Sequence, residues 1–267
     1  MPSLLGTLVF IVIPYADVIR RSFYEAIGGT FAGLQNYAEV LKNEAFHLAA
    51  LNTGRFLLTC IPLLIVFSLF CSVMIAGLKE GGTVFKTTLL VPLAIPVASI
   101  VLLWKLFFHQ QGMLNQITAL FGLGEKDWMN GSTAFGVLVF TYLWKNTGYD
   151  VVLWVAGLSA ISEELYEAAR VDGAGALARF FYITLPGLSG TAFLVAALSV
   201  FNSFKVFREA YLIAGDYPDE SIYMLQHLFN NWFVNLDVQK MSAASVLLLL
   251  TVAVPVMIWN RSRRRNG

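Results

Sequence analysis

The chain has 267 residues, of which 57% are hydrophobic and 13% charged, and its formal net charge is +1. Its mean hydropathy of +0.68 is far above that of a soluble domain, in which about 25% of the residues are charged. The composition therefore excludes an ordinary soluble domain and indicates a membrane protein. The near-zero net charge gives no sign of a nucleic-acid partner.

Six apolar segments approach the length of about 20 residues that a helix needs to cross a bilayer. They lie at residues 4–19, 56–78, 87–108, 134–158, 188–204 and 243–259. The first begins close to Met1 but lacks the basic start and the small-residue cleavage site of a signal peptide, so we expect it to be retained. The sequence thus predicts an all-α membrane protein with six transmembrane helices in a single domain over residues 1–267.

The third segment contains two prolines, Pro92 and Pro96, one helical turn apart. Each removes a backbone hydrogen bond from a helix. Such breaks are tolerated in a bilayer where protein or a water-filled cavity satisfies the freed carbonyls, so this segment is expected to line a pathway. The alternative is a packing kink without a role in transport.

The fourth segment carries polar side chains near its middle, where they are costly to bury in lipid. Asn146 and Asp150 share one helix face, as do Lys145 and Tyr149. One interpretation is an ion pair or hydrogen-bond network, involving Lys145 and Asp150, that holds neighbouring helices together. The other is a binding site, in which Asn146 and Tyr149 supply the neutral amide and aromatic ring that suit a sugar.

A polar loop at 160–187 separates the fourth and fifth segments. Ser162, followed by two glutamates, is expected to cap a helix that runs to about Asp172. Gly173 then permits a turn, a second short helix covers 174–182, and Pro186 ends it and opens the fifth segment. An ordinary amphipathic surface helix is the alternative.

The fifth segment ends in a second group of polar side chains. Ser199 lies three or four residues before Asn202 and Ser203, so these side chains point the same way into a helix bundle. Ser199 alone would more commonly bond a carbonyl of its own helix.

Basic residues near the C-terminus predict the orientation of the chain. Arg261 and the three arginines at 263–265 form a basic cluster typical of the cytoplasmic end of a membrane span. Because the number of predicted spans is even, the N-terminus is then expected in the cytoplasm as well. The extracytoplasmic segments are 20–55, 109–133 and 205–241. The last includes a turn with Asp216, Asp219 and Glu220 beside aromatic residues, which either docks a delivery protein or belongs to the aromatic belt at the membrane surface.

No pattern in the sequence points to catalysis. Cys60 and Cys71 are separated by roughly 16 Å of helix and cannot pair with each other. The three histidines lie in separate segments without metal-ligand spacing, so no metal site is expected. A phosphate-binding loop and a nucleophile elbow are also missing, so the chain is not expected to be an enzyme or to bind a cofactor.

The spacing of the 160–187 loop, together with the six spans, the paired prolines and the outer segment after the fifth span, resembles the permease subunits of ABC importers of the maltose-permease type. The loop itself resembles their EAA loop, and the similarity extends from about residue 2 to residue 259. It implies the type I permease fold. It also implies that one set of residues couples the chain to an ATPase: Glu167, Ala168, Ala169, Asp172, Gly173, Ala174, Ile183, Leu185 and Pro186.

The resemblance implies that the chain forms half of the transmembrane pathway of an ATP-driven sugar importer that works by alternating access, with an oligosaccharide as cargo. The implied partners are a second permease subunit, two cytoplasmic ATPase subunits that hold ATP and Mg, and an extracytoplasmic solute-binding protein. The implied location is the prokaryotic plasma membrane, with several membrane passes. Many relatives have a longer cytoplasmic start, so Met1 is not expected to be the natural one.

In the resembling family the third, fourth and fifth spans line the substrate cavity. The candidate pathway residues, from the two lines of reasoning together, are Leu93, Val97, Asn146, Tyr149, Asp150, Ser199, Asn202 and Ser203. Leu93 and Val97 are apolar where some relatives are polar, and Ser162 replaces a proline that is common before the EAA helix. These departures concern the identity of the sugar more than the transport role.

Two alternatives remain open. An ion-coupled secondary transporter would need a coupling-ion site and usually internal repeats, and the six segments show no convincing repeat. An importer permease for a non-sugar solute such as glycerol phosphate would favour a cation that faces the cavity, for which Lys145 is the mid-span candidate.

Overall fold

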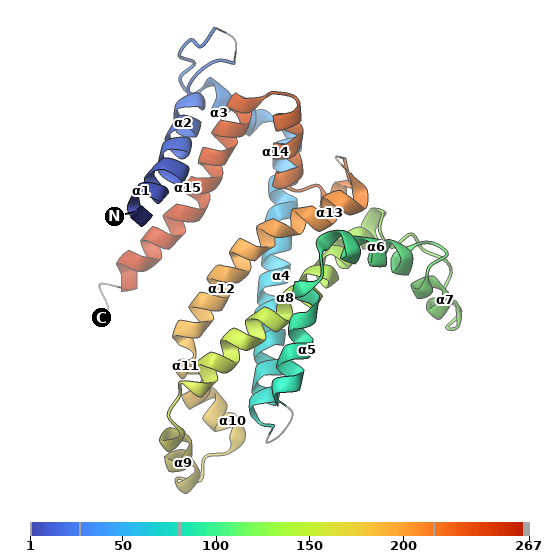
Figure 1. Cartoon of the computed structure of the whole chain (residues 1–267), viewed down its shortest axis with the longest axis vertical. Helices are drawn as coiled ribbons and strands as arrows, with labels where there is room; N and C mark the ends of the chain where they lie inside the picture. Colours follow the sequence, from blue (N-terminus) through green and yellow to red (C-terminus); the bar gives the residue numbers. More distant parts are fainter. Residues whose placement is uncertain (1, 27, 79–81, 216, 264–267) are drawn as a thin grey trace. The chain divides into compact units, whose positions relative to one another are not determined.

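The computed structural model describes residues 2–26, 28–78, 82–215 and 217–263. Every regular element in these ranges is a helix, apart from one isolated bridge between Tyr24 and Phe31. The predicted all-α class is therefore confirmed. The chain divides into two compact units, one of residues 1–51 and 224–267 and the other of residues 52–223 (Figure 1). Whether they act as the single predicted domain stays a prediction.

The first unit is built around the C-terminal helix. Its helices are α1 (Pro2–Thr7), η1 (Leu8–Val12), α2 (Ile13–Arg21), α3 (Gln35–Lys42), α14 (Leu225–Val234) and α15 (Val238–Arg263). Helix α15 packs against α2, α3 and α14. The Tyr15 hydroxyl donates to the Ser245 carbonyl at 3.3 Å, and the Asn36 amide donates to the Ser22 and Tyr24 carbonyls, each at 3.0 Å.

Helix α4 (Glu44–Ala76) begins in the first unit and continues into the second. The other elements of the second unit are α5 (Gly82–Ala94), α6 (Val97–Phe108), α7 (Met113–Ala119), η2 (Gly131–Thr133), α8 (Ala134–Ser159), α9 (Glu163–Val171), α10 (Ala176–Arg179), η3 (Phe180–Thr184), α11 (Leu185–Gly187), α12 (Ser189–Ser203), η4 (Phe204–Val206), α13 (Phe207–Ala214) and η5 (Glu220–Ile222). Helix α8 is central because it packs against both α5 and α12 (Figure 1).

Two prolines are accommodated by widened π-helical turns. A proline ring in an α-helix clashes with the carbonyl four residues earlier and lacks the N–H that would bond it. The π-helices η1 and η3 end two residues before Pro14 and Pro186, respectively, and their wider turns leave more room for the proline ring. The expectation that Pro186 ends a helix is therefore wrong, because helical structure continues through it from α10 to α11.

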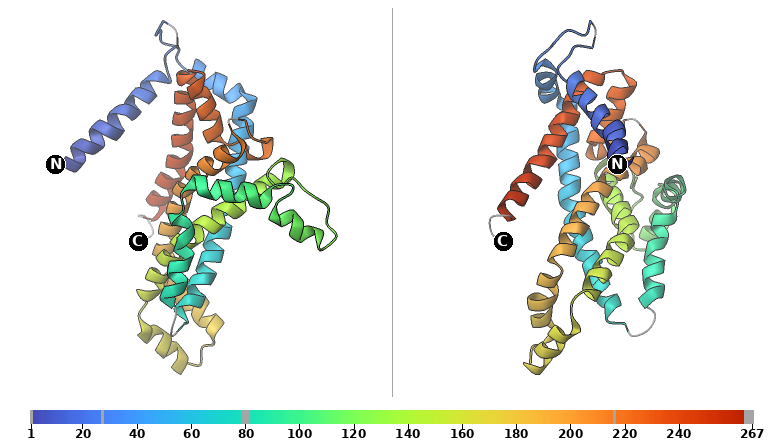
Figure 2. Two further views of the ribbon diagram at one scale, coloured as in Figure 1. Left: turned by 45° about the vertical axis from the view of Figure 1, so that its right-hand side comes forward. Right: turned by 60° about the vertical axis from the view of Figure 1, so that its left-hand side comes forward.

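The predicted third span is broken. Helix α5 ends at Ala94, because the residue before a proline, here Ile95, is pushed out of the helical region by Pro96. The helical segments on either side of this break are bent by 92° (Figure 2). Residues 87–108 therefore do not form one straight helix. Of the two prolines expected to loosen it, Pro96 lies at the break and Pro92 lies inside α5.

Three helices in the described part of the chain are long and apolar enough to cross a membrane: Ser3–Arg21, Glu44–Ala76 and Ser189–Tyr211. The broken pair Val84–Ala94 and Val97–Ala119 makes a fourth if it counts as one span. Helix α8 is long enough but polar at its middle, and the predicted apolar segment 243–259 lies within α15. Each of the six predicted segments is mostly helical, with the third broken at residues 95–96, so the structure is consistent with six spans without establishing that number.

Small residues allow α8 to approach its neighbours closely. A Cβ atom at Gly148 would collide with the carbonyl of Leu89 on α5, and one at Gly157 would collide with the Thr191 side chain on α12. Between these glycines, the fully buried Trp154 donates its indole N–H to the Ser68 hydroxyl on α4 at 3.0 Å. Helix α8 is therefore held by backbone proximity as well as by side-chain packing.

Gly148→Ala is expected to destabilise the protein by about 1–3 kcal/mol, because the added methyl group meets rigid backbone and α5 has to shift. Gly136→Ala on the same helix is the matched control, since its Cβ would meet nothing within 4 Å and alanine favours a helix. Thermal unfolding of the purified protein in detergent measures both. Equal unfolding temperatures for the two variants would contradict the close approach of α5 and α8.

Candidate functional site

The 160–187 loop turns at Gly173. Two amides after α9 donate to carbonyls at its end. The Gly173 amide donates to the Arg170 carbonyl at 3.1 Å, and the Ala174 amide donates to the Ala169 carbonyl at 2.8 Å. This pair of bonds is a Schellman motif, which requires the positive φ of +78° found at Gly173. The predicted turn at Gly173 is therefore confirmed, and its cause is a backbone conformation that only glycine adopts readily.

The start of α9 differs from expectation. Ser162 has an extended backbone at the N-cap position, but its side chain makes no capping hydrogen bond, so the predicted hydroxyl cap is wrong. Its backbone carbonyl accepts from the Leu165 amide at 3.3 Å instead. The second helix, α10, begins at Ala176 rather than Ala174, because Gly175 has an extended backbone before it.

One side-chain hydrogen bond closes the loop. The hydroxyls of Tyr166 on α9 and Thr184 at the end of η3 lie 2.8 Å apart, and Thr184 is buried. Neither residue was among the predicted coupling residues. Nothing in their sequence spacing indicates the contact, because it depends on how the turn at Gly173 folds α9 back toward η3. This bond ties the first helix of the loop to the segment that leads into α12.

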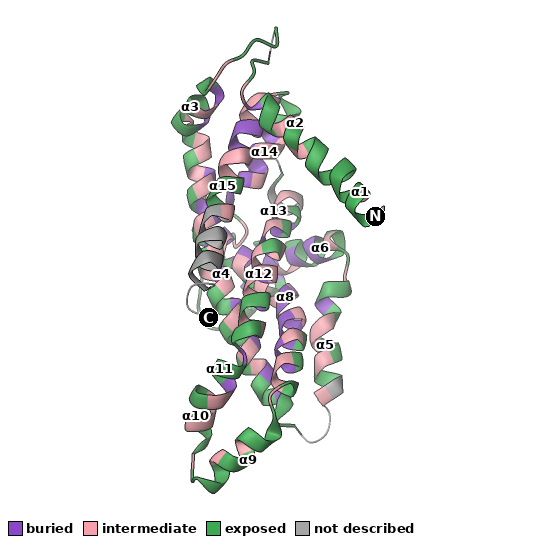
Figure 3. Cartoon of the chain, turned by 90° about the vertical axis from the view of Figure 1, so that its left-hand side faces the viewer, coloured by how far each residue is buried: buried purple, intermediate pink, exposed green. Residues whose placement is uncertain are grey.

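The predicted coupling residues lie mostly on the surface of the loop. Of the set, Ala169, Ala174 and Ile183 are partly buried, and the other six, Glu167, Ala168, Asp172, Gly173, Leu185 and Pro186, are exposed. Apolar side chains that were not predicted are exposed beside them: Leu165 is 54% exposed, Val171 88% and Leu177 75% (Figure 3). A concentration of exposed apolar side chains on a helical loop is typical of a protein interaction site.

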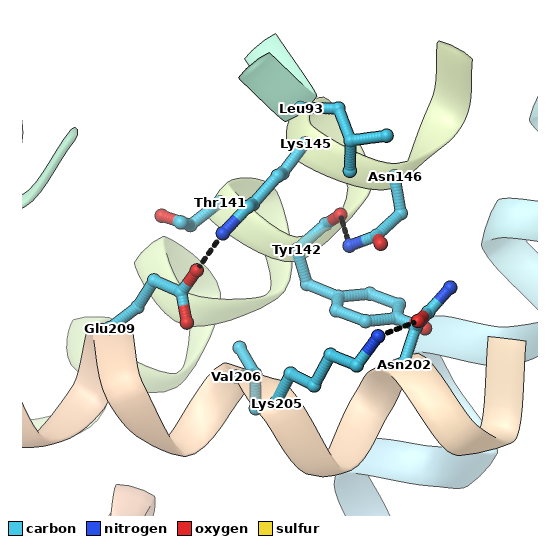
Figure 4. A pocket seen from close by; sticks show the side chains of 9 residues that line it. All are labelled: Leu93, Thr141, Tyr142, Lys145, Asn146, Asn202, Lys205, Val206 and Glu209. Atoms are coloured by element: carbon cyan, nitrogen blue, oxygen red, sulfur yellow. Dashed lines mark hydrogen bonds and ion pairs between the residues drawn. The ribbon is translucent and has the colours of Figure 1, made fainter. Parts of the chain in front are cut away.

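A small polar cavity lies among α5, α8, α12 and α13 in the second unit. Its volume is about 70 Å³, enough for about two water molecules. Its lining combines amides, hydroxyls and charged groups with two apolar side chains (Figure 4). The lining residues are Leu93, Thr141, Tyr142, Lys145, Asn146, Asn202, Lys205, Val206 and Glu209.

An ion pair crosses this cavity. Lys145 Nζ on α8 lies 2.5 Å from Glu209 Oε1 on α13, with the two side chains 17% and 3% exposed (Figure 4). Lys145 therefore pairs with Glu209 and not with Asp150. Of the two interpretations of the sequence, the polar network between helices is present, with Glu209 as its acid. Glu209 was missed because it follows the fifth segment, in a region expected to be extracytoplasmic.

Asp150 makes its own link between helices. The Ser199 hydroxyl on α12 lies 2.9 Å from Asp150 Oδ2 and 2.8 Å from the carbonyl of Val195, so the expected bond to its own helix is present beside a link to α8. The Tyr142 hydroxyl donates to the Ser199 carbonyl at 2.7 Å. Two residues of α8 thus bond to one residue of α12.

Only some of the predicted pathway residues come together. Leu93, Asn146 and Asn202 line the polar cavity, whereas the other five, Val97, Tyr149, Asp150, Ser199 and Ser203, do not. The Asn146 amide donates to the Tyr142 carbonyl at 2.8 Å, and Asn202 Oδ1 accepts from Lys205 at 2.8 Å (Figure 4). The roles of all eight residues in transport stay predictions.

The turn after α13 is bonded to another predicted outer segment. Asp219 accepts hydrogen bonds from the amides of Ser221 at 2.9 Å and Gly131 at 3.1 Å, and the bonds from Ser221 hold the pKa of its carboxyl below the usual value. Tyr217 beside it is 74% exposed. Asp216 lies outside the described residues. Asp219 therefore braces the turn, and docking at this turn stays a prediction.

Lys145→Met or Glu209→Gln alone is expected to destabilise the protein by about 3–5 kcal/mol, because each leaves the other charge buried without its partner. The double variant Lys145→Met/Glu209→Gln removes both charges and is expected to recover most of this loss. Thermal unfolding in detergent of the single and double variants gives the coupling between the two sites. Additive losses in the double variant would contradict a direct pair.

Similar proteins are transport permeases. The family model for the binding-protein-dependent transport system inner membrane component matches residues 65–264. The trehalose/maltose transport system permease protein MalF of Thermococcus litoralis is 29% identical, over 99% of this chain and 92% of that protein. The sn-glycerol-3-phosphate transport system permease protein UgpA of Escherichia coli is 26% identical, over 96% of this chain and 90% of that protein.

A solved structure with the same fold is the bacterial alginate ABC transporter in complex with alginate pentasaccharide-bound periplasmic protein. One of its chains matches with a TM-score of 0.81 and 20% identity, over 100% of this chain and 93% of that chain. The predicted ABC importer permease fold is thus confirmed. Because the family model spans 200 of the 267 residues (65 to 264), the chain belongs to the family of inner membrane components of binding-protein-dependent transport systems.

Proposed function

We propose that this inner membrane transport component forms half of the transmembrane pathway of an ATP-driven importer and couples to a separate ATPase through the 160–187 loop. The observation that carries the proposal is the exposed loop itself, in which two short helices meet at Gly173 and present Val171 and Leu177 to the surroundings. Family membership supports the same role. ATP and Mg would be bound by the ATPase subunits and not by this chain.

The contacts around the loop support transmission of force to the helices. The Schellman turn fixes the end of α9, and the Tyr166–Thr184 bond ties α9 to the end of η3, the segment that follows α10. Helical structure then continues through η3 and α11 almost directly into α12, and α12 is bonded to α8 by Ser199 and Asp150. A displacement of the loop by the closing ATPase would therefore move α12 and α8 together, which is the motion that alternating access requires.

The remaining parts of the assembly follow from this role. Both termini would be cytoplasmic, with the 160–187 loop on the same side, and residues 20–55, 109–133 and 205–241 would lie outside. The partners would be a second permease subunit, two ATPase subunits and an extracytoplasmic solute-binding protein. The solved alginate transporter, whose complex contains a periplasmic protein, supports the last of these.

We infer that the cargo is a carbohydrate, in particular an oligosaccharide. The amides of Asn146 and Asn202 and the hydroxyl of Thr141 line the polar cavity, and such neutral groups suit the hydroxyls of a sugar. Lys145 is neutralised by Glu209, which removes the mid-span cation expected for a phosphate ester. The similarity to MalF supports a sugar. The similarity to UgpA, together with Lys205 in the cavity lining, keeps glycerol phosphate as the second candidate.

Gly173→Val is expected to abolish transport while leaving membrane insertion intact, because a β-branched residue is strained at the positive φ of the turn. Gly175→Val is the matched control: Gly175 has φ −66° and ψ 169°, which valine adopts readily, and open space for a side chain. Uptake of labelled sugar into cells that express the assembled transporter measures both variants. Normal uptake with Gly173→Val would refute the coupling role.

Asn202→Ala is expected to raise the KM for uptake by roughly tenfold, because it removes one neutral hydrogen-bonding group from the pathway. The control is Asn130→Ala, which removes an exposed amide bonded to Asp127, away from the polar cavity. Uptake rates at a series of sugar concentrations give KM for each variant. An unchanged KM in Asn202→Ala would remove this residue from the pathway.

A further inference from the structure

A second, larger cavity lies at the base of the 160–187 loop, where it joins the long helices. Its volume is about 800 Å³. It is bounded by Ala76 and Gly77 at the end of α4, by residues 158–163 from the end of α8 to the start of α9, and by Tyr166, Arg170 and Arg179. The exposed apolar residues that we assign to the ATPase contact, Leu165, Val171 and Leu177, do not line it. The cavity is therefore distinct from that surface.

The polar part of this cavity has an excess of positive charge. Arg170 and Arg179 both line it, and Glu163 is the one carboxylate in the lining. Arg170 donates its Nε to the carbonyl of Tyr166 at 3.3 Å, which leaves its two terminal nitrogens for another acceptor. Within the described part of the chain, neither arginine has a carboxylate within 4.0 Å. Two guanidinium groups in the lining of one cavity suit a phosphate group.

An apolar compartment adjoins the polar part. A neighbouring cavity of about 430 Å³ shares Ala76, Gly77, Leu158, Tyr166 and Arg179 with the first. Its remaining lining is mostly apolar and comes from Val73, Ala176, Phe180 and Thr184. The two cavities thus offer a cationic wall beside an apolar one, which matches a molecule with an anionic head and a hydrocarbon tail.

We propose that this cavity binds an anionic phospholipid, with the phosphate on Arg170 and Arg179 and an acyl chain along Val73 and Phe180. Its position at the ends of α4 and α8 fits the depth of the headgroups, where basic pockets between transmembrane helices recognise acidic lipids. The lipid would bridge α4 and the 160–187 loop and brace the loop where it emerges from the membrane. The cytoplasmic placement of this lipid rests on the orientation given in the proposed function.

The test is native mass spectrometry of the purified full-length chain, titrated in detergent with phosphatidylglycerol and, in parallel, with phosphatidylcholine. Arg170→Gln and Arg179→Gln are each expected to weaken phosphatidylglycerol binding by roughly tenfold. Arg208→Gln, which removes an exposed arginine from α13, is the matched control and is expected to bind as the unaltered chain does. Ala176→Trp, which fills the apolar compartment and keeps both charges, is expected to weaken binding as well.

Equal binding of phosphatidylglycerol by all these variants, or equal binding of the two lipids, would overturn the proposal. Displacement of the lipid by millimolar inorganic phosphate would also overturn it, because the site would then take a soluble anion. A third contrary result is loss of lipid when the ATPase subunits assemble, which would assign the cavity to that interface. The lipid titrations use the chain without its ATPase, so they are independent of whether the 160–187 loop couples to one; only the assembly experiment depends on that coupling.

Discussion

Polar side chains buried within the second unit need partners, and this need determines how α8 is joined to its neighbours. Lys145 and Asp150 lie on one helix, yet they bond to different ones, to Glu209 on α13 and Ser199 on α12. A charge left without such a partner in this setting would be strongly destabilising. The bonds, together with the close approach at Gly148 and Gly157, make α8 the element through which α5, α12 and α13 are connected.

The 160–187 loop is connected to this group of helices by nearly continuous helical structure. The π-helix η3 is important here, because it lets the chain pass through Pro186 without a loose connection. The turn at Gly173 and the bond between Tyr166 and Thr184 hold the two short helices together. The loop is therefore connected to α12 by nearly continuous helical structure, in keeping with the proposed transmission of force, and the lipid proposed at its base would add a link to α4.

Much of the fold could be predicted from the sequence because it depends on local chemistry. Three features depend mainly on residues close by in the chain. These are the apolar segments of sufficient length, the helix break at Pro96 and the turn at Gly173. The accommodation of Pro186 could not be predicted in this way, because the choice between stopping a helix and widening a turn depends on the packing around it.

The candidate site was less predictable than the fold. The pairing of Lys145 with Glu209 joins residues 64 positions apart, and it depends on where α13 lies after the end of α12. The Tyr166–Thr184 contact similarly exists only after the loop has folded. By contrast, Asn146 and Asn202 were identified from their polarity within apolar segments, and both line the same small cavity. Polarity in an apolar segment thus indicates involvement in a network, whereas the partner is set by the tertiary structure.

If the 160–187 loop links this permease to an ATPase, the two proteins should form a stable complex. The most direct measurement is the ATPase activity of the complex that co-purifies with this chain in detergent, with and without solute-binding protein loaded with candidate oligosaccharides. The account predicts that an ATPase co-purifies and that its turnover rises with the loaded binding protein. A chain that purifies without any ATPase, or an activity indifferent to the loaded binding protein, would contradict it.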